Sequence, residues 1–222
     1  MLMETAASFA CRLIFFMNEA SCCDTACIAH AFVSVIPQKF DYKITTEWRR
    51  NEIANAKSLK VKREKAFAWI LLEYAVKTVF GNNLESFSPK KNENGKLVFD
   101  KIFASISHSG NYVIAVVAKN PVGCDIEEIK QRDFSRLVEK FTTENEKQLF
   151  NTSNDKITCF YKLWTAKEAL FKLSKGTIFS PQKISVDNKV NFFRAENFIT
   201  AVAFDSKIRF SFLRYNNGMF LD

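Results

Sequence analysis

Apolar and polar positions divide the chain into a helical segment, a group of strands, two further helices and a strand-rich tail. Residues 10–17, ACRLIFFM, predict a short first strand. From Lys62 to Gly81 apolar residues recur at helical spacing, and Gly81 is typical of a helix C-terminus. The polar stretch SPKKNENGK, residues 88–96, is rich in turn formers and predicts a loop.

Three consecutive segments then have the composition of strands. They read KIFASISHSG, NYVIAVVAK and PVGCDIEEI, and breaks are expected at Ser109-Gly110 and at Asn120-Pro121. Thr143 and Glu146 have the spacing of a capping box, which predicts the start of a helix. A longer helix is expected from DKITCF to Gly176, followed by four strands: KISVDN, KVNFFRA, NFITAVAF and KIRFSFLRY.

Two of the predicted strands resemble each other. NYVIAVVA at 111–118 and NFITAVAF at 197–204 agree in residue size and order, and each follows a long predicted helix. This repeat predicts an α+β fold of two similar α/β lobes related by a pseudo-twofold axis. The lobes would be residues 1–119 and 120–222, with a ligand cleft between them.

Composition limits the class of protein. A hydrophobic fraction of 47% and a charged fraction of 25% are ordinary for a globular chain of 222 residues. No apolar run approaches the roughly 18–20 residues of a membrane helix, and Glu4 stands where a secretory signal would carry positive charge. We therefore expect a cytoplasmic protein without membrane contact.

The net charge of +8 suggests an anionic partner. A bias toward Lys, Asn, Ile and Phe, with 23 Phe, offers a purely compositional explanation. No run of Lys and Arg exceeds two residues, and aromatic and basic residues do not alternate as single-strand binders require. Nucleic-acid binding is therefore the weaker interpretation.

The six cysteines match no disulfide framework, and free thiols are expected. Cys23, Cys27 and His30 could share a helical face, but zinc would need a fourth ligand. Buried small residues are the favoured interpretation.

Asp125 and Glu127 follow an apolar run in PVGCDIEEIK and, being two apart in a strand, would point to the same side. Two adjacent carboxylates repel each other, and a bound Mg²⁺ or Mn²⁺ would remove that repulsion. Gly123 would let a ligand approach the backbone. The alternative, equally weighted on this stretch alone, is a strand that ends in solvated acids.

Two other segments carry candidate groups. Trp164, Glu168 and Lys172 lie four apart on one helix face. Glu168 could be a third metal ligand or a base and Lys172 a phosphate contact, although such a pair is commonly a solvated surface pair. In SISHSG, Ser107 and His108 form a plausible phosphate contact, whereas a lone histidine is more often structural.

These motifs together resemble the 4′-phosphopantetheinyl transferases, and within them the larger, single-chain, surfactin-synthetase-activator type. The resemblance rests on FASISHSG, on Gly-x-Asp-x-Glu at 123–127 and on LWTAKEALFK, and it covers about residues 47–176. Such enzymes move the phosphopantetheine arm of coenzyme A to a serine of an apo acyl or peptidyl carrier protein. They release adenosine 3′,5′-bisphosphate and serve fatty acid, polyketide or nonribosomal peptide synthesis.

The resemblance implies a role for each matching residue. Asp125, Glu127 and Glu168 would hold Mg²⁺, Glu168 would also be the base for the serine hydroxyl, and Lys172 would contact the diphosphate. The remaining coenzyme A contacts would be Lys57, Arg63, Lys96, Ser107 and His108. Leu97 stands where the family has a proline after the lysine.

Two similar lobes in one chain would make a monomer sufficient. A noncatalytic nucleotide- or nucleic-acid-binding module with a basic surface remains the alternative function. A family member that binds coenzyme A without turnover is a third possibility, against which the three intact carboxylates speak.

Overall fold

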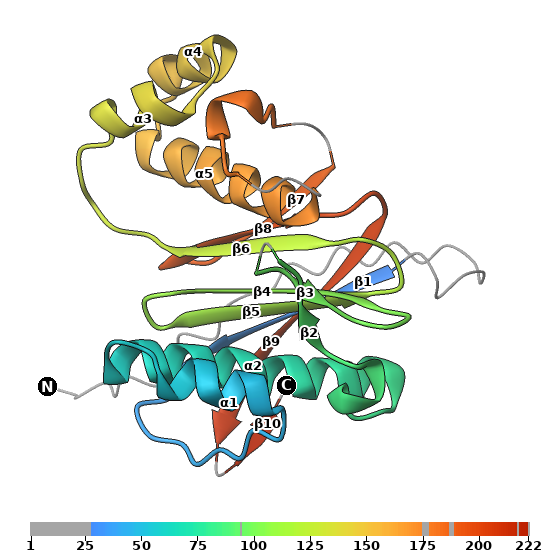
Figure 1. Ribbon diagram of the computed structural model, residues 1–222. Coiled ribbons are helices and arrows are strands. Elements are labelled where there is room, and N and C mark those ends of the chain that lie inside the picture. The colour runs from blue at the N-terminus through green and yellow to red at the C-terminus, as the bar shows by residue number, and fades with distance from the viewer. Residues whose placement is uncertain (1–27, 94, 175–177, 187–188, 217, 222) are drawn as a thin grey trace, which may run out of the picture.

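The computed structural model describes residues 28–221, except 94, 175–177, 187–188 and 217. Two β-sheets pack against each other, and each carries helices on its outer face (Figure 1). The helices are α1 (Glu47–Ala54), α2 (Leu59–Phe80), α3 (Ser135–Phe141), α4 (Glu144–Thr152) and α5 (Lys156–Leu173), with 3₁₀ turns η2 (Leu84–Phe87) and η3 (Pro181–Lys183). The strands are β1 (Ile28–Val35), β2 (Lys90–Lys91), β3 (Leu97–Val98), β4 (Phe103–Ser109), β5 (Tyr112–Ala118), β6 (Gly123–Glu128), β7 (Val190–Arg194), β8 (Phe198–Ala203), β9 (Lys207–Asn216) and β10 (Met219–Leu221).

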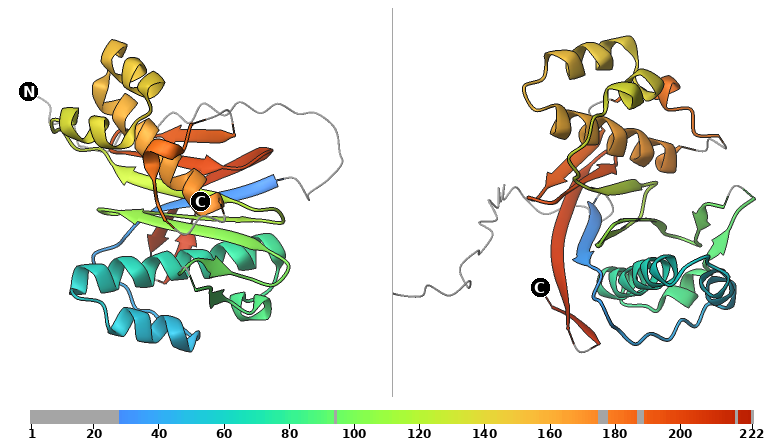
Figure 2. Two further views of the ribbon diagram at one scale, coloured as in Figure 1. Left: turned by 45° about the horizontal axis from the view of Figure 1, so that its top comes forward. Right: turned by 90° about the vertical axis from the view of Figure 1, so that its left-hand side faces the viewer.

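The larger sheet has the order β10-β9-β1-β5-β4 and the smaller one β6-β8-β7. All neighbours in these sheets are antiparallel except β1 and β9, which are parallel. The late strand β9 therefore completes a sheet that the first described strand begins. Figure 2 shows the long β9 beside β1, below the sheet that carries α5.

Three apolar layers follow from this arrangement. One face of the larger sheet packs on α2, where Phe67, Trp69 and Leu71 are fully buried. The facing sides of the two sheets enclose a second core that contains Ile114, Cys124 and other small or branched residues. The outer face of the smaller sheet packs on α5. Alternation of side chains along β5 and β8 is what supplies both faces with apolar groups.

Several predicted elements are confirmed. Gly81 ends α2 with a left-handed φ of 71°, and Ser58 caps its start by accepting a hydrogen bond from the Val61 amide. Thr143 and Glu146 form the expected capping box at the start of α4. The three strands β4, β5 and β6 and the breaks between them lie where the sequence placed them.

Other predictions need correction. The segment KISVDN, residues 183–188, was expected to be a strand, but its described residues are the end of η3 and irregular backbone. The Ile184 carbonyl accepts a hydrogen bond from a lysine side chain instead of a neighbouring strand. The predicted 88–96 loop contains strand β2, which forms a short hairpin with β3. Helix α5 ends at Leu173, and the expected end at Gly176 lies outside the described residues, as does the predicted strand at 10–17. Strand β1 was not predicted.

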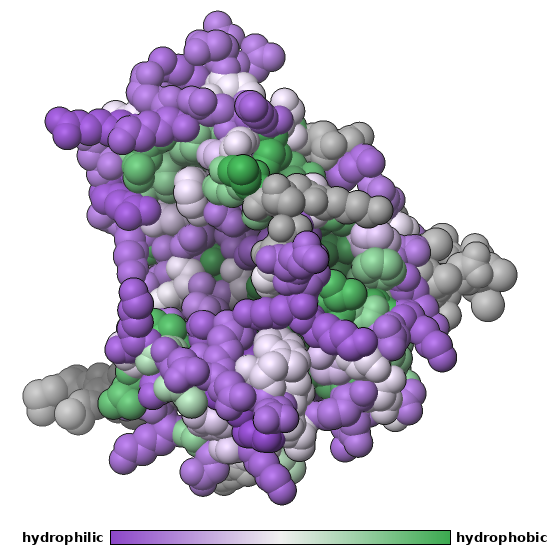
Figure 3. All heavy atoms as spheres, viewed as in Figure 1, coloured by the Kyte–Doolittle hydropathy of each residue, from purple (hydrophilic) through white to green (hydrophobic). Residues whose placement is uncertain are grey.

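Figure 3 shows the hydropathy of one face of the molecule. Hydrophilic residues cover most of the face seen in Figure 3, with apolar residues gathered mainly toward its middle. Within the described part of the chain, no helix combines the length and apolar character needed to cross a bilayer.

Candidate active site

Strand β6 presents two carboxylates on one side and apolar groups on the other. Cys124 and Ile126 are buried in the core between the sheets. Asp125 and Glu127 point the opposite way, as their spacing predicts. The side chain of Asp125 is not solvated, because the residue is only 4% exposed. For Asp125, the interpretation as a solvated acid at the end of a strand is therefore wrong.

A stripe of alternating serines on β4 holds these carboxylates. The hydroxyl of Ser107 donates to Oδ1 of Asp125 at 2.7 Å, and that of Ser109 donates to Oε2 of Glu127 at 2.6 Å. The hydroxyl of Ser105 accepts from the Cys124 amide at 3.0 Å. The three serines thus connect the edge strand of the larger sheet to the edge strand of the smaller one.

Helix α5 brings the third part of the site. Lys172 donates from Nζ to Oδ1 of Asp125 at 2.8 Å and to the hydroxyl oxygen of Ser107 at 3.0 Å. Glu168 lies one helical turn before Lys172 and interacts electrostatically with both Asp125 and Glu127. The structure therefore brings together five of the predicted site residues, from β4, β6 and α5.

Gly123 makes this assembly possible in a way that the sequence did not suggest. A Cβ at this position would lie 2.0 Å from the Ala169 carbonyl oxygen and 2.5 Å from the Leu173 amide nitrogen. The close approach that Gly123 permits is therefore that of the α5 backbone, not that of a ligand. This contact sets the distance between the strand that carries Asp125 and the helix that carries Glu168.

The electrostatics of the site are those of carboxylates crowded in a half-buried space. Burial raises the pKa of Glu127, and the charge of Asp125 raises it further. Burial also raises the pKa of Glu168, again with a contribution from Asp125. Burial opposes the charge of Lys172, but the neighbouring carboxylates outweigh it and raise its pKa. Lys172 therefore remains protonated and positively charged beside Asp125.

His108 points away from this group, toward α2. Its Nδ1 lies 3.6 Å from Oε2 of the buried Glu64. Burial lowers the pKa of His108, Glu64 partly offsets this, and Lys172 and Arg49 lower it further. Arg49 belongs to a cluster in which Glu52 also contacts lysines 65 and 91. His108 therefore connects the carboxylate site to a basic region on α1 and α2.

The three other predicted coenzyme A contacts, Lys57, Arg63 and Lys96, make no described contact with the carboxylates of the site. The ammonium group of Lys96 donates to the carbonyl oxygens of Phe171 and Ser174 at the end of α5. Lys57 is exposed between α1 and α2. Arg63 is half-buried on α2, and its Nε is buried without a hydrogen bond. The described contacts bring neither Lys57 nor Arg63 to Asp125.

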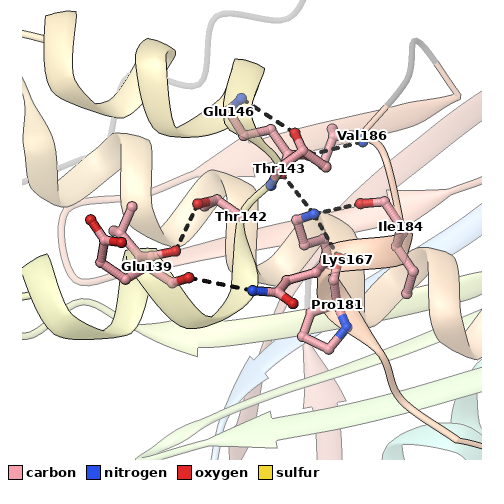
Figure 4. Close-up of polar contacts among 10 residues, drawn as sticks. Glu139, Thr142, Thr143, Glu146, Lys167, Pro181, Ile184 and Val186 are labelled. Atoms are coloured by element: carbon pink, nitrogen blue, oxygen red, sulfur yellow. Dashed lines mark hydrogen bonds and ion pairs between the residues drawn. The ribbon is translucent and has the colours of Figure 1, made fainter.

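The helix that carries Glu168 is anchored by a buried ion pair that sequence reasoning missed. Lys167 is fully buried, and its Nζ lies 2.7 Å from Oε2 of Glu146 on α4 (Figure 4). It also donates to the carbonyl oxygens of Pro181 and Ile184. Lysine is rarely buried without a partner, so this network fixes α4, α5 and the 181–186 segment relative to one another.

Metal-binding potential can be judged from the donor atoms. Within the described residues, no three His, Cys, Asp or Glu side chains are grouped closely enough to hold a metal ion. Oδ2 of Asp125 is nevertheless buried and has no hydrogen-bond partner, and the nearby acids supply the hard oxygens that Mg²⁺ prefers. The zinc alternative fails at His30, which lies on strand β1 and not on a helix, while Cys23 and Cys27 lie outside the described residues.

Comparison with known proteins adds independent findings. Residues 121–209 match the family model described as 4′-phosphopantetheinyl transferase superfamily. The chain is 38% identical over 91 residues to the 4′-phosphopantetheinyl transferase gsp of Aneurinibacillus migulanus, covering 39% of this chain and 38% of that protein. It is 33% identical over 110 residues to the 4′-phosphopantetheinyl transferase psf-1 of Bacillus pumilus, covering 47% of each. The matches thus span less than half the length of these relatives.

Proposed function

We propose that the chain, whose residues 121–209 belong to the 4′-phosphopantetheinyl transferase superfamily, transfers the phosphopantetheine arm of coenzyme A to a serine of an apo carrier protein. The observation that supports this most directly is the meeting of Asp125, Glu127, Glu168 and Lys172 between β6 and α5. Transfer from a diphosphate requires that charge on the leaving phosphate be neutralised. Lys172 carries a positive charge for that task, and the three carboxylates would contribute by holding a divalent cation.

The proposed step breaks one phosphorus–oxygen bond and forms another. The carrier serine oxygen attacks the phosphorus that bears the pantetheine arm, and adenosine 3′,5′-bisphosphate leaves with the bridging oxygen. Glu168 accepts the serine proton, and its raised pKa brings it nearer to the working range of a general base. Lys172 keeps its proton beside Asp125 and hydrogen-bonds the diphosphate.

Asp125, Glu127 and Glu168 would hold a Mg²⁺ or Mn²⁺ ion, which requires that their carboxylates draw closer together than the structure describes them. The buried Oδ2 of Asp125, which has no hydrogen-bond partner, favours a bound cation here. Burial and, to a smaller extent, repulsion from the neighbouring acids raise the pKa values of the two glutamates, and a cation would offset both effects. When bound, the metal would supply charge neutralisation for the diphosphate.

The adenosine end of coenzyme A would extend from the carboxylates toward α2. Ser107 and His108 lie on this side of the site, and His108 leads to the basic cluster that includes Arg49. Lys57, Arg63 and Lys96 complete the proposed contacts, because phosphates are bound by positive groups. For Lys96 this requires that its ammonium group exchange the α5 carbonyls for the ligand.

We further propose the two-lobed organisation with residues 1–119 and 120–222, a pseudo-twofold axis and a cleft between the lobes. Strands β5 and β8, which carry the repeated sequence, each pack beneath a long helix, α2 and α5 respectively. The protein would act as a cytoplasmic monomer whose partners are coenzyme A and an acyl or peptidyl carrier protein. Nucleic acid and membranes would not be partners.

The test is mass spectrometry of several apo carrier proteins incubated with coenzyme A. A gain of about 340 Da is expected with Mg²⁺ and not after chelation, as follows from the transferred arm in a metal-assisted reaction. Transfer that is unaffected by chelation would contradict the metal. If no carrier is modified and the protein binds plain DNA or RNA with steep salt dependence, the noncatalytic alternative is favoured.

A further inference from the structure

A cavity of about 630 Å³ lies between α2, η2 and the β9–β10 hairpin. It is lined by the face of α2 that carries Glu73, Tyr74 and Lys77, and by Tyr215 and Phe220 of the hairpin. Strands β9 and β10 form one side of the larger sheet, whereas the serine stripe lies on β4 at the other side. The cavity is therefore separate from the candidate active site.

The carboxyl group of Glu73 is the unusual feature of this cavity. Its Oε1 is buried and makes no hydrogen bond. Burial raises the pKa of Glu73 to about 7, and the nearby charge of Glu85 contributes to this rise. The Trp69 indole lowers the pKa of Glu73 by a smaller amount, although its Nε1 makes no hydrogen bond. A buried carboxylate oxygen without a hydrogen bond is costly, so a ligand that supplied a positively charged donor would stabilise it.

Aromatic rings form the apolar wall. The ring centroids of Tyr74 and Phe220 are 4.7 Å apart, and those of Tyr215 and Phe220 are 5.0 Å apart. Aromatic rings present a negative face, which attracts cations as well as flat apolar groups. The cavity therefore combines an acidic group with a surface for an apolar body.

We propose that this cavity binds a small organic cation, an ammonium group attached to a flat apolar body, with the ammonium between Glu73 and Glu85 and the body against Tyr74 and Phe220. The charged and titratable groups that line the cavity are Lys43, Glu73, Tyr74, Lys77, Glu85 and Tyr215. Lys43 and Lys77 are both exposed, and neither is among the groups that shift the pKa of Glu73. An anionic ligand would therefore find no positively charged group beside the buried oxygen of Glu73.

Isothermal titration calorimetry with three ligands of similar shape tests the proposal on the full chain. The ligands are 2-phenylethylammonium, the uncharged 2-phenylethanol and the anionic 3-phenylpropionate. The ammonium compound is expected to bind at least about tenfold more tightly than the alcohol, as a charged hydrogen bond replaces a neutral one. Equal affinity for the alcohol, tighter binding of the carboxylate, or no binding of any of the three would overturn the proposal.

Proton linkage supplies a second readout. Because Glu73 must be ionised to pair with the ligand, affinity should rise about tenfold between pH 6 and pH 8, as expected for a group with a pKa of about 7. Glu73→Gln should abolish this pH dependence and weaken binding, whereas Lys77→Met, on the same helix face, should retain both. A pH dependence that persists in Glu73→Gln would contradict the assignment.

A further variant keeps the test decisive if Glu73→Gln does not fold. Phe220→Leu retains apolar volume but removes the ring against which the ligand would lie, and it should weaken the ammonium compound more than about fivefold. Unchanged affinity in Phe220→Leu would contradict the proposed binding mode.

Discussion

The ammonium group of Lys172 on α5 donates a hydrogen bond of 2.8 Å to Oδ1 of Asp125 on β6, although 47 residues separate the two in the chain. The same oxygen accepts a hydrogen bond from Ser107 on β4. One carboxylate oxygen thus connects elements from both sheets and from α5. This leaves Oδ2 as the oxygen of Asp125 that has no protein partner.

Replacement of Asp125 by Asn should abolish most of the transfer activity. The change removes the negative charge that pairs with Lys172 and that would bind a cation. Loss of one such electrostatic group lowers kcat about 10²–10³-fold. The measurement is the rate at which an apo carrier gains the phosphopantetheine arm, followed by mass spectrometry. Asp205→Asn, which alters an exposed ion pair with Lys189, is the matched control and should retain full activity.

Asp125→Asn should also lower the pKa of Lys172. Burial alone opposes the charge of this lysine, and Asp125 is the first of the groups that compensate. Titration of the lysine by NMR in the two proteins would show this. Normal transfer by a folded Asp125→Asn protein would reject the proposed site.

Gly123→Ala should destabilise the protein and impair catalysis together. The added Cβ would meet the α5 backbone at 2.0 Å, so the helix must shift away from β6. Overpacking of this kind costs about 1–3 kcal/mol in the free energy of unfolding, which urea titration measures. Because α5 carries Glu168 and Lys172, kcat should fall as well.

Gly81→Ala provides the comparison for Gly123→Ala. Gly81 has a φ of 71°, and a Cβ added there would meet no other atom within 4 Å, so alanine costs about 1–2 kcal/mol through backbone strain alone. It should leave kcat unchanged in the folded protein. If Gly123→Ala retains wild-type kcat, the close packing of α5 on β6 does not control the site.

The serine stripe can be tested one residue at a time. Ser105→Ala removes the acceptor of the buried Cys124 amide, so the free energy of unfolding should fall by about 1–3 kcal/mol. Ser109→Ala removes the acceptor of the Glu128 amide and, in addition, the hydrogen bond to the carboxylate of Glu127. This variant should therefore raise the pKa of Glu127, because that hydrogen bond lowers it, and Ser105→Ala should not. Chemical denaturation and carboxyl NMR titration separate the two effects. Equal consequences for both variants would contradict the distinct roles.

Spacing predicted the two halves of this candidate site, and the family resemblance implied that they meet. Asp125 and Glu127 share a strand face, and Glu168 and Lys172 share a helix face, so each pair follows from spacing alone. The sequence analysis assigned the space beside Gly123 to a ligand, because a glycine in a strand indicates that another group lies close to the backbone but not which group it is. Lys167 was missed because nothing local distinguishes a buried lysine from its exposed neighbours. Strand β1 was missed because its main partners, β5 and β9, are distant in the chain.

Glu52 should give the protein an acid-sensitive contribution to stability. Burial opposes its charge, but hydrogen bonds from Lys91, Lys65 and Arg49 lower its pKa to about 2. Because the folded-state pKa lies below that of the unfolded chain, the stabilisation is present above about pH 4.3 and is lost as the pH falls toward 2. Glu52→Gln should therefore lower the free energy of unfolding at pH 7 by about 1 kcal/mol after allowance for solvent screening, and by less at pH 3. A pH-independent difference between the two proteins would contradict this origin.

The buried Lys167–Glu146 pair should behave as a coupled unit. Lys167→Met leaves Glu146 buried without its cation and removes the donor to the carbonyls of Pro181 and Ile184, so the free energy of unfolding should fall by about 3–5 kcal/mol. Glu146→Gln added to the Lys167→Met variant removes the unpaired charge but keeps a side-chain oxygen for the capping box. The double variant should therefore recover a substantial part of the lost free energy of unfolding. Denaturant titrations of the wild type, both single variants and the double variant form the required cycle. Additive effects of the two changes would show that the ion pair does not couple α4 to α5.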